Sequence, residues 1–122
     1  MFFISIDGDD IGQKITASYL NNDMDSLKEI NCLVNHKTHQ IADFLSNIGF
    51  TIMFCAADGV AGFIDNVQID EFELFDEIKA FIGNEITFSM GVGASMRESY
   101  IALLSAKSHG KDRVHSYNDL KG

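Results

Sequence analysis

The 122-residue chain has no proline, no tryptophan, only two cysteines and half as many basic as acidic residues. Without proline or a low-complexity stretch, no segment is typical of a linker, and we expect one domain over residues 1–122. The two cysteines, Cys32 and Cys55, are too few for a disulfide framework. We therefore expect reduced thiols in apolar surroundings, and a cytoplasmic protein.

Long apolar runs and a basic leader are missing as well. No run approaches the roughly 20 residues that span a bilayer, and the segment Met1–Asp7 has neither a basic start nor a cleavage site. We expect no contact with a membrane. The net charge of −9 also argues against binding of long DNA or RNA, because proteins that bind these polymers usually carry a basic surface. A small nucleotide arriving with Mg²⁺ stays compatible with this charge, because the metal supplies positive charge.

Short apolar runs and apolar residues at helical spacing divide the chain into strands and helices. The predicted strands are 2–6, 50–57, 60–64, 86–94 and 113–117, and the predicted helices are 11–20, 26–47, 72–82 and 95–108. Capping-box spacings at Ser26–Glu29 and Ser95–Glu98 start two of these helices. Gly49 and Gly110 stand where helices end, and Asp58-Gly59 between two apolar runs predicts a hairpin.

The order strand, two helices, hairpin, helix, strand, helix, strand indicates an α+β fold. Its first part is the split β-α-β arrangement, with a mainly antiparallel sheet and helices packed on it. In that arrangement the first strand lies beside the third, and the end of the first strand meets the hairpin turn. We therefore expect Asp7 and Asp58 at one edge of the sheet.

Two carboxylates at one edge repel each other unless a cation lies between them, and Mg²⁺ or Mn²⁺ with oxygen ligands is the natural occupant. The Gly8 carbonyl could approach the same ion, and Asp9 and Asp10 add further acids. Such a site suits in-line displacement at phosphorus. Two structural alternatives stay open: Asp9 or Asp10 could only cap the helix that starts at Ile11, and Asp58 could only begin a turn.

Basic residues gather near the end of the last helix, at Lys107, Lys111 and Arg113. They could hold a triphosphate, or they could simply complement the helix dipole. Lys14, one turn past the acids, could also reach a phosphate. His36 and His39 share a helix face, but without a third ligand nearby they indicate a solvated surface.

Two segments resemble known families. Ile-Ser-Ile-Asp-Gly-Asp-Asp-Ile-Gly at residues 4–12 resembles the opening motif of the minimal CRISPR polymerase family, a stand-alone relative of the palm domain in type III CRISPR complexes. Residues 89–93 and 106–114 are similar to the last strand–helix–loop segment of GGDEF diguanylate cyclases. The resemblance covers almost the whole chain and implies a ferredoxin-like palm domain.

The resemblance also implies roles for individual residues. Asp7 and Asp58 would be carboxylate metal ligands with the Gly8 carbonyl, and Asp9 or Asp10 would support a second metal. The residues implied in nucleotide and phosphate binding are Gly8, Ile11, Gly12, Lys14, Ala57, Gly59, Lys107, Lys111 and Arg113. The implied reaction is attack by a ribose hydroxyl on the α-phosphate of a nucleoside triphosphate, ATP above all, with release of pyrophosphate.

Relatives make cyclic oligonucleotide signals in bacterial antiviral defence. The resemblance therefore implies a cyclic di- or oligonucleotide product of the cyclic di-AMP type, ring closure across a homodimer, and a separate effector protein that reads the product.

One departure from the family pattern concerns the hairpin. Family members have two glycines, an acid and a further acid, whereas this chain has Ala56-Ala57-Asp58-Gly59. The missing acid and the lost glycines keep a second hypothesis open, a catalytically degenerate palm that binds or senses a nucleotide. A third hypothesis keeps the fold and changes the reaction to that of a mononucleotide cyclase or a nucleotide hydrolase.

Overall fold

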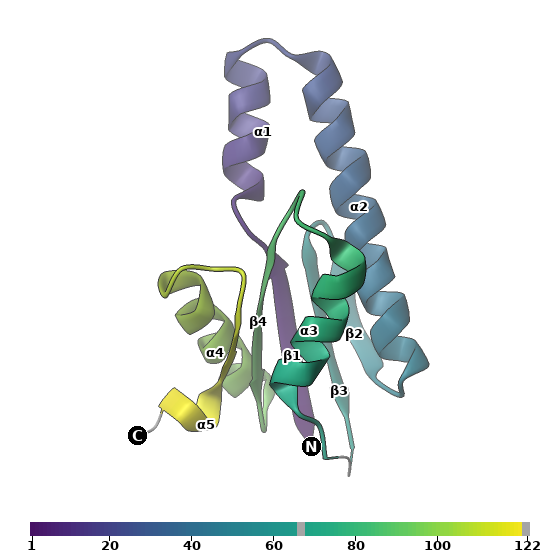
Figure 1. Ribbon diagram of the computed structural model, residues 1–122, viewed down its shortest axis with the longest axis vertical. Helices are drawn as coiled ribbons and strands as arrows, with labels where there is room; N and C mark the ends of the chain where they lie inside the picture. The colour runs from purple at the N-terminus through teal and green to yellow at the C-terminus, as the bar shows by residue number, and fades with distance from the viewer. Residues whose placement is uncertain (66–67, 121–122) are drawn as a thin grey trace.

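The computed structural model describes residues 1–65 and 68–120, with a five-stranded sheet at its centre (Figure 1). The elements in chain order are β1 (Phe2–Gly8), α1 (Ile11–Leu20), α2 (Met24–Asn47), β2 (Thr51–Ala56), β3 (Gly59–Ile64), α3 (Glu71–Ile82), β4 (Phe88–Gly93), α4 (Met96–Ser108), β5 (Val114–Ser116) and α5 (Tyr117–Leu120). Among these residues no helix is both long enough and apolar enough to cross a bilayer.

The strand order is β2-β3-β1-β4-β5, which confirms the predicted α+β fold and the position of the first strand beside the third. β1 runs antiparallel to both β3 and β4, β2 runs antiparallel to β3, and only β5 is parallel to its neighbour β4. Figure 1 shows α1 and α2 extending as an antiparallel pair beyond the end of the sheet at which β1 stops. The site described below lies at that end.

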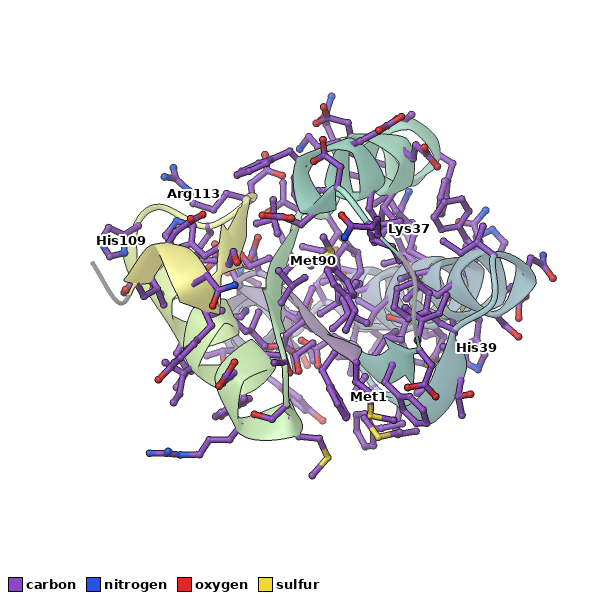
Figure 2. The ribbon with its side chains drawn as sticks, turned by 90° about the horizontal axis from the view of Figure 1, so that it is seen from below. Met1, Lys37, His39, Met90, His109 and Arg113 are labelled. Carbon is purple, nitrogen blue, oxygen red and sulfur yellow. The ribbon has the colours of Figure 1, made fainter. Side chains whose placement is uncertain are left out.

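The hydrophobic core lies between one face of the sheet and the helices α2 and α3. Alternate residues of β1 and β4, such as Ile4, Ile6 and Met90, point into it and are almost completely buried. Met90 lies near the centre of the molecule in Figure 2. The Lys37 ammonium of α2 is also buried and donates to the Ile82 carbonyl at the end of α3, which ties these two helices together (Figure 2).

Helix α4 packs on the opposite face of the sheet, over β1 and β4. Gly91 makes this close approach possible, because a methyl group there would lie 2.1 Å from the Leu103 backbone nitrogen and 2.2 Å from the Ser99 carbonyl oxygen. Across the contact the Ser5 and Ser99 hydroxyls form a 2.8 Å hydrogen bond. The backbone of α4 therefore lies against the sheet.

Edge strand β2 carries an irregularity in its pairing with β3. Ile52 pairs with Gly62 and Phe54 with Ala61, so Met53 is the extra residue of a β-bulge. In a regular ladder Met53 would pair with Ala61 and Phe54 would point to the core face. The bulge instead turns Phe54 to the face on which α4 lies.

Several predicted boundaries are wrong for local reasons. The long helix starts at Met24 and not at the capping box Ser26–Glu29, because the Asp23 carboxylate accepts hydrogen bonds from the Ser26 backbone and hydroxyl at 3.0 and 2.8 Å. The second capping box is confirmed in part: Ser95 accepts from the Glu98 amide, but Glu98 accepts from the Ala94 amide and not from Ser95.

Three of the strand predictions are too long at their ends, whereas those for β1 and β3 are too short. The observed strands Thr51–Ala56, Phe88–Gly93 and Val114–Ser116 are shorter than predicted, and the short helix α5 follows without a predicted signal. Phe50 and Ile86 are buried just outside their strands, which explains why apolar runs extended the predictions. The prediction for Cys32 is wrong because its side chain is exposed on α2, whereas Cys55 packs against the core; both thiols are free.

Candidate active site

The end of β1 and the β2–β3 turn bring Asp7 and Asp58 together. Asp7 pairs with Gly59 in the ladder, and the Gly8 amide donates to the Asp58 carbonyl at 2.9 Å. Burial chiefly raises the pKa of Asp7 above 3.8; the Lys107 ammonium opposes this rise, and Asp58 adds to it. The edge thus brings two acids close together, and a cation beside them would relieve their mutual repulsion.

The Lys107 ammonium, from the last turn of α4, contacts three oxygen atoms. It is 3.1 Å from an Asp7 carboxylate oxygen, 2.8 Å from the Gly8 carbonyl oxygen and 3.3 Å from an Asp9 carboxylate oxygen. Burial lowers the pKa of Lys107, but the hydrogen bonds and charges of Asp7 and Asp9 outweigh it and hold the pKa above 10.5. A positive charge therefore already stands among the predicted metal ligands.

Asp9 is buried and holds the loop around the site together. Its carboxylate accepts hydrogen bonds from the Thr87 and Ser89 hydroxyls, both at 2.7 Å, and from the Asp112 amide at 3.0 Å. With Lys107 it has four partners, which occupy its oxygen lone pairs. This arrangement favours a positioning role for Asp9 over direct coordination of a metal.

Asp10 stands at the N-cap position of α1, but its side chain makes no capping bond there. Its backbone is left-handed, with φ of 60°, and its carboxylate pairs with the Lys111 ammonium. Lys111 holds the pKa of Asp10 below 3.8. The pair links the start of α1 to the loop after α4, so the Asp9–Asp10 segment and the basic cluster are in contact.

A cavity of about 700 Å³ opens beside this edge, between α1, α2 and the hairpin turn. We call it the helical cavity. Four of the predicted site residues line it: Ile11, Gly12, Ala57 and Asp58. The other lining residues, which the sequence did not single out, are Ile15, Tyr19, Leu27, Lys28, Ile30, Asn31, Val34 and Asn35. Largely apolar walls with a few amides and one lysine suit a base and ribose.

Two predicted phosphate ligands lie apart from the acids. Lys14 lines a different depression, on the side of α1 that faces Asp23 and Glu85. The Arg113 guanidinium folds back and donates to the Lys111 carbonyl at 3.0 Å. The roles predicted for Lys14 and Arg113 therefore need their side chains to move when a nucleotide binds.

The polar residues that hold Asp9 are not predicted from the sequence. Thr87 and Ser89 offered a signal, since both are polar residues within the otherwise apolar run 86–94, and Ser89 is completely buried. Asp112 offered none, because its amide reaches Asp9 from a segment far away in the chain. Sequence patterns locate elements, but they do not pair individual side chains across a sheet.

The residues at the edge fit a hard divalent cation. No group of three acidic, histidine or cysteine side chains in residues 1–65 and 68–120 could hold a metal by itself. Mg²⁺ nevertheless commonly binds through one or two carboxylates and completes its shell with water and substrate phosphates. Asp7, Asp58 and the Gly8 carbonyl form such a set, and the Lys107 ammonium marks the place where their oxygens favour a positive charge.

The altered hairpin is strained at the second of the two lost glycines. Ala57 has φ of 51°, a left-handed conformation that alanine adopts at a cost of about 1 kcal/mol. Gly8, by contrast, is needed for space, because a methyl group there would lie 2.9 Å from Ile11 and 3.1 Å from the Asp58 side chain.

Comparisons with known proteins agree on the family and on the fold. The model of the minimal CRISPR polymerase domain matches residues 3–117. A search of curated proteins found no match.

Solved structures of GGDEF domains resemble the whole chain. The GGDEF domain of DgcB from Caulobacter crescentus, in complex with c-di-GMP, has a TM-score of 0.72 at 14% identity. The match covers 96% of this chain and 77% of the DgcB chain. The active GGEEF domain of a Vibrio cholerae diguanylate cyclase has a TM-score of 0.63 at 18% identity. The match covers 95% of this chain and 81% of the Vibrio cholerae chain. The guanylyl cyclase Cya2 has a TM-score of 0.55 at 11% identity, and the match covers 85% of this chain and 68% of the Cya2 chain. At these identities the likeness establishes a shared palm fold.

Proposed function

We propose that the chain, which belongs to the minimal CRISPR polymerase family, is a metal-dependent nucleotidyltransferase that joins nucleoside triphosphates, ATP above all, into a cyclic di- or oligonucleotide. The observation that supports this most strongly is the convergence of Asp7, the Gly8 carbonyl and Asp58 beside the helical cavity. Metal-binding oxygens and a nucleotide-sized cavity thus share one residue, Asp58.

Different residues around the site would bind different parts of one nucleoside triphosphate. The base and ribose enter the helical cavity, where Asn31 and Asn35 offer amide groups to the base edge. The triphosphate extends toward Lys107 and Lys111, which leave their carboxylate partners for phosphate oxygens. Asp9 keeps the loop in place while Lys107 moves, because three other donors hold it.

Asp7, Asp58 and the Gly8 carbonyl would hold Mg²⁺ or Mn²⁺. A bound divalent ion would supply charge stabilisation for the phosphate oxygens and the attacking hydroxyl. Asp9 or Asp10 would serve a second ion only by giving up present partners. We therefore assign Asp9 to positioning and Asp10 to holding Lys111 until a nucleotide arrives.

The product we propose is of the cyclic di-AMP type. One chain offers one helical cavity, so we propose that two chains face each other as a homodimer to close the ring. In the cytoplasm a separate effector protein would read this signal in defence against phages, as the family resemblance implies.

The direct test is incubation of the purified protein with each nucleoside triphosphate and Mn²⁺, followed by mass spectrometry of products and a pyrophosphate assay. We expect a cyclic nucleotide from ATP that disappears in Asp7→Asn. The matched control is Asp76→Asn, an exposed acid on α3. Product from Asp7→Asn at the wild-type rate would contradict the proposed catalytic site.

A second function, nucleotide sensing without catalysis, is favoured by two observations. The strained Ala57 turn lacks the acid that follows in active relatives, and Lys107 already neutralises Asp7. A sensor would bind ATP tightly and release no pyrophosphate. A cyclic mononucleotide as the sole product would instead favour the mononucleotide cyclase.

A further inference from the structure

The connection between α1 and α2 carries an exposed apolar surface. Of the large apolar side chains in residues 1–65 and 68–120, the three most exposed are Leu20 at 82%, Met24 at 73% and Tyr19 at 70%. We call these three residues the hairpin tip. Tyr19 also lines the helical cavity, whereas Leu20 and Met24 lie outside both that cavity and the hydrophobic core. Apolar side chains gathered in this way are typical of a surface that contacts another molecule.

The hairpin tip stands well beyond the end of the sheet that carries the site. Helix α1 begins at Ile11, just past the end of β1, and its ten residues span about 15 Å at 1.5 Å per residue. Figure 1 shows α1 and α2 projecting together past the point where β1 stops. A second protein that approaches the Asp7–Asp58 edge end-on therefore passes alongside the hairpin tip.

A second exposed apolar surface lies beside the site, on the α4 side of the sheet. It is a depression of about 350 Å³ between α4 and the strands β1 and β3, and we call it the α4 groove. Its lining includes Phe54, Tyr100 and Leu104, which are 53%, 56% and 49% exposed. The β-bulge in β2 is what turns Phe54 to this side. Asp7 and Lys107 also line the groove, so it begins at the site.

The proposed homodimer brings these two surfaces to the same place. Closing one ring between two chains directs both site ends toward that ring, and a symmetric dimer relates the chains by a two-fold axis. Helices α2 and α3 cover one face of the sheet, and α4 covers the other. A two-fold axis that lies in the plane of the sheet, across the strands, exchanges these faces. The hairpin of each chain then passes the α4 side of its partner.

The other possible axis is perpendicular to the sheet, and it brings the hairpin of each chain to the α1–α2 side of the partner. The surface beside the site on that side is the helical cavity, which the partner's own nucleotide fills. The axis in the plane of the sheet instead sets an apolar tip against an apolar groove and leaves both nucleotides in their cavities. The exposed apolar residues therefore favour the axis in the plane of the sheet.

We propose that the hairpin tip of each chain docks on the α4 groove of a second copy of the chain, with Leu20 and Met24 against the exposed apolar side chains of α4 and β2. This inference rests on the proposed ring closure between two chains and adds the surfaces that join them. The contact occurs twice in a symmetric dimer, so a modest apolar area on each surface is buried twice. Lys107 stays with the phosphates of its own chain, at the end of the groove next to the site.

Opposite charges on the two surfaces test this contact. Leu20→Lys places an ammonium on the hairpin tip, and Leu104→Glu places a carboxylate in the α4 groove. In either variant alone, both contacts set an unpaired charge against apolar surface, so the dimer dissociation constant should rise by roughly tenfold or more. A mixture of the two variants forms dimers with one unchanged contact and one ion pair, and most of the affinity should return. Sedimentation velocity measures it with the α,β-methylene analogue of ATP, which cannot release pyrophosphate.

Two controls separate the contact from the effect of an added charge. Phe72→Glu changes an exposed apolar residue of α3 outside both surfaces and should dimerise as the wild type does. A mixture of Leu20→Lys with Leu104→Lys sets two ammonium groups against each other and should dimerise more weakly than the mixture with Leu104→Glu. Urea unfolding should show that every variant folds. Equal affinities of the two mixtures would overturn the inference, and so would a wild type that stays monomeric with the analogue.

Pyrophosphate release from ATP by the wild type separates this inference from the proposed function. If the oppositely charged variants restore the dimer but the wild type releases no pyrophosphate, the interface stands and the enzyme is overturned. If the wild type makes a cyclic nucleotide and neither Leu20→Lys nor Leu104→Glu weakens its dimer, the enzyme stands and the interface is overturned.

Discussion

At the scale of single residues, the neighbouring acids Asp9 and Asp10 occupy opposite environments. Asp9 is 2% exposed and has four hydrogen-bond partners, whereas Asp10 is exposed and pairs with one lysine. A buried carboxylate that loses its acceptor capacity leaves its donors unsatisfied, but an exposed pair is replaced by water. The two acids therefore have separate roles despite their adjacency.

Asp9→Asn should destabilise the protein by about 3 kcal/mol, because the amide nitrogen would face a hydroxyl or ammonium donor in a buried place. Asp10→Asn should leave the free energy of unfolding nearly unchanged. Urea unfolding of both variants measures the difference. Equal changes in the free energy of unfolding would mean that the hydrogen bonds to Asp9 do not hold the loop around the site.

Lys107 contacts two of the groups that we assign to a metal, the Asp7 carboxylate and the Gly8 carbonyl. In Lys107→Met the competition disappears, and the affinity for Mn²⁺ without nucleotide should rise by roughly tenfold, because a hydrogen bond to a charged group contributes about 1.5–3 kcal/mol. Isothermal titration at pH 8, well above the ordinary carboxylate range, measures it.

Lys111→Met is the matched control for that titration. Its ammonium pairs with Asp10 and lies on none of the three oxygens, so its affinity for Mn²⁺ should stay close to that of the wild type. Both variants should lose product formation, because each lacks a phosphate ligand. An affinity that Lys107→Met leaves unchanged would mean that the metal binds elsewhere.

At the scale of elements, the type and order of nearly every helix and strand could be predicted. Both ends of α1 and the last residues of α2, α3 and α4 could be predicted too, whereas the ends of most strands could not. The apolar spacing that predicts a strand continues through Phe50 and Ile86, because both residues are buried outside regular pairing. The start of α2 depends on whether the Asp23 or the Ser26 side chain reaches an amide, and both are good caps. The bulge in β2 depends on its partner strand, which local sequence does not reveal.

The close contact of α4 with the sheet predicts the effect of one methyl group. Gly91→Ala should destabilise the protein by about 3 kcal/mol or more, because the new atom overlaps the α4 backbone, which cannot rotate away. Gly12→Ala, with open space at its Cβ position, should keep or raise stability by up to about 1 kcal/mol. Thermal unfolding of the two variants tests this, and equal melting temperatures would mean that α4 can shift.

At the scale of the whole molecule, acids far apart in the sequence meet at one end of the sheet. Strand order predicted this for Asp7 and Asp58, because the split β-α-β arrangement fixes which strand ends meet. It did not predict the helical cavity, since this cavity depends on how far α1 and α2 project and on which side chains leave space between them.

Divalent metal should stabilise the fold as a whole. An ion that binds only the native state at about 100 times its dissociation constant adds roughly 2.7 kcal/mol to the free energy of unfolding. We expect Mn²⁺ to raise the melting temperature of the wild type, and EDTA to reverse the change. Asp76→Asn should respond as the wild type does, whereas a response that survives in Asp7→Asn would place the metal outside the carboxylate pair.

The position of Lys107 has a consequence for the order in which ligands bind. Its ammonium contacts the Asp7 carboxylate and the Gly8 carbonyl, two of the groups that we assign to the metal. A triphosphate that draws this ammonium away frees both oxygens, so the metal should bind more tightly once a nucleotide is present.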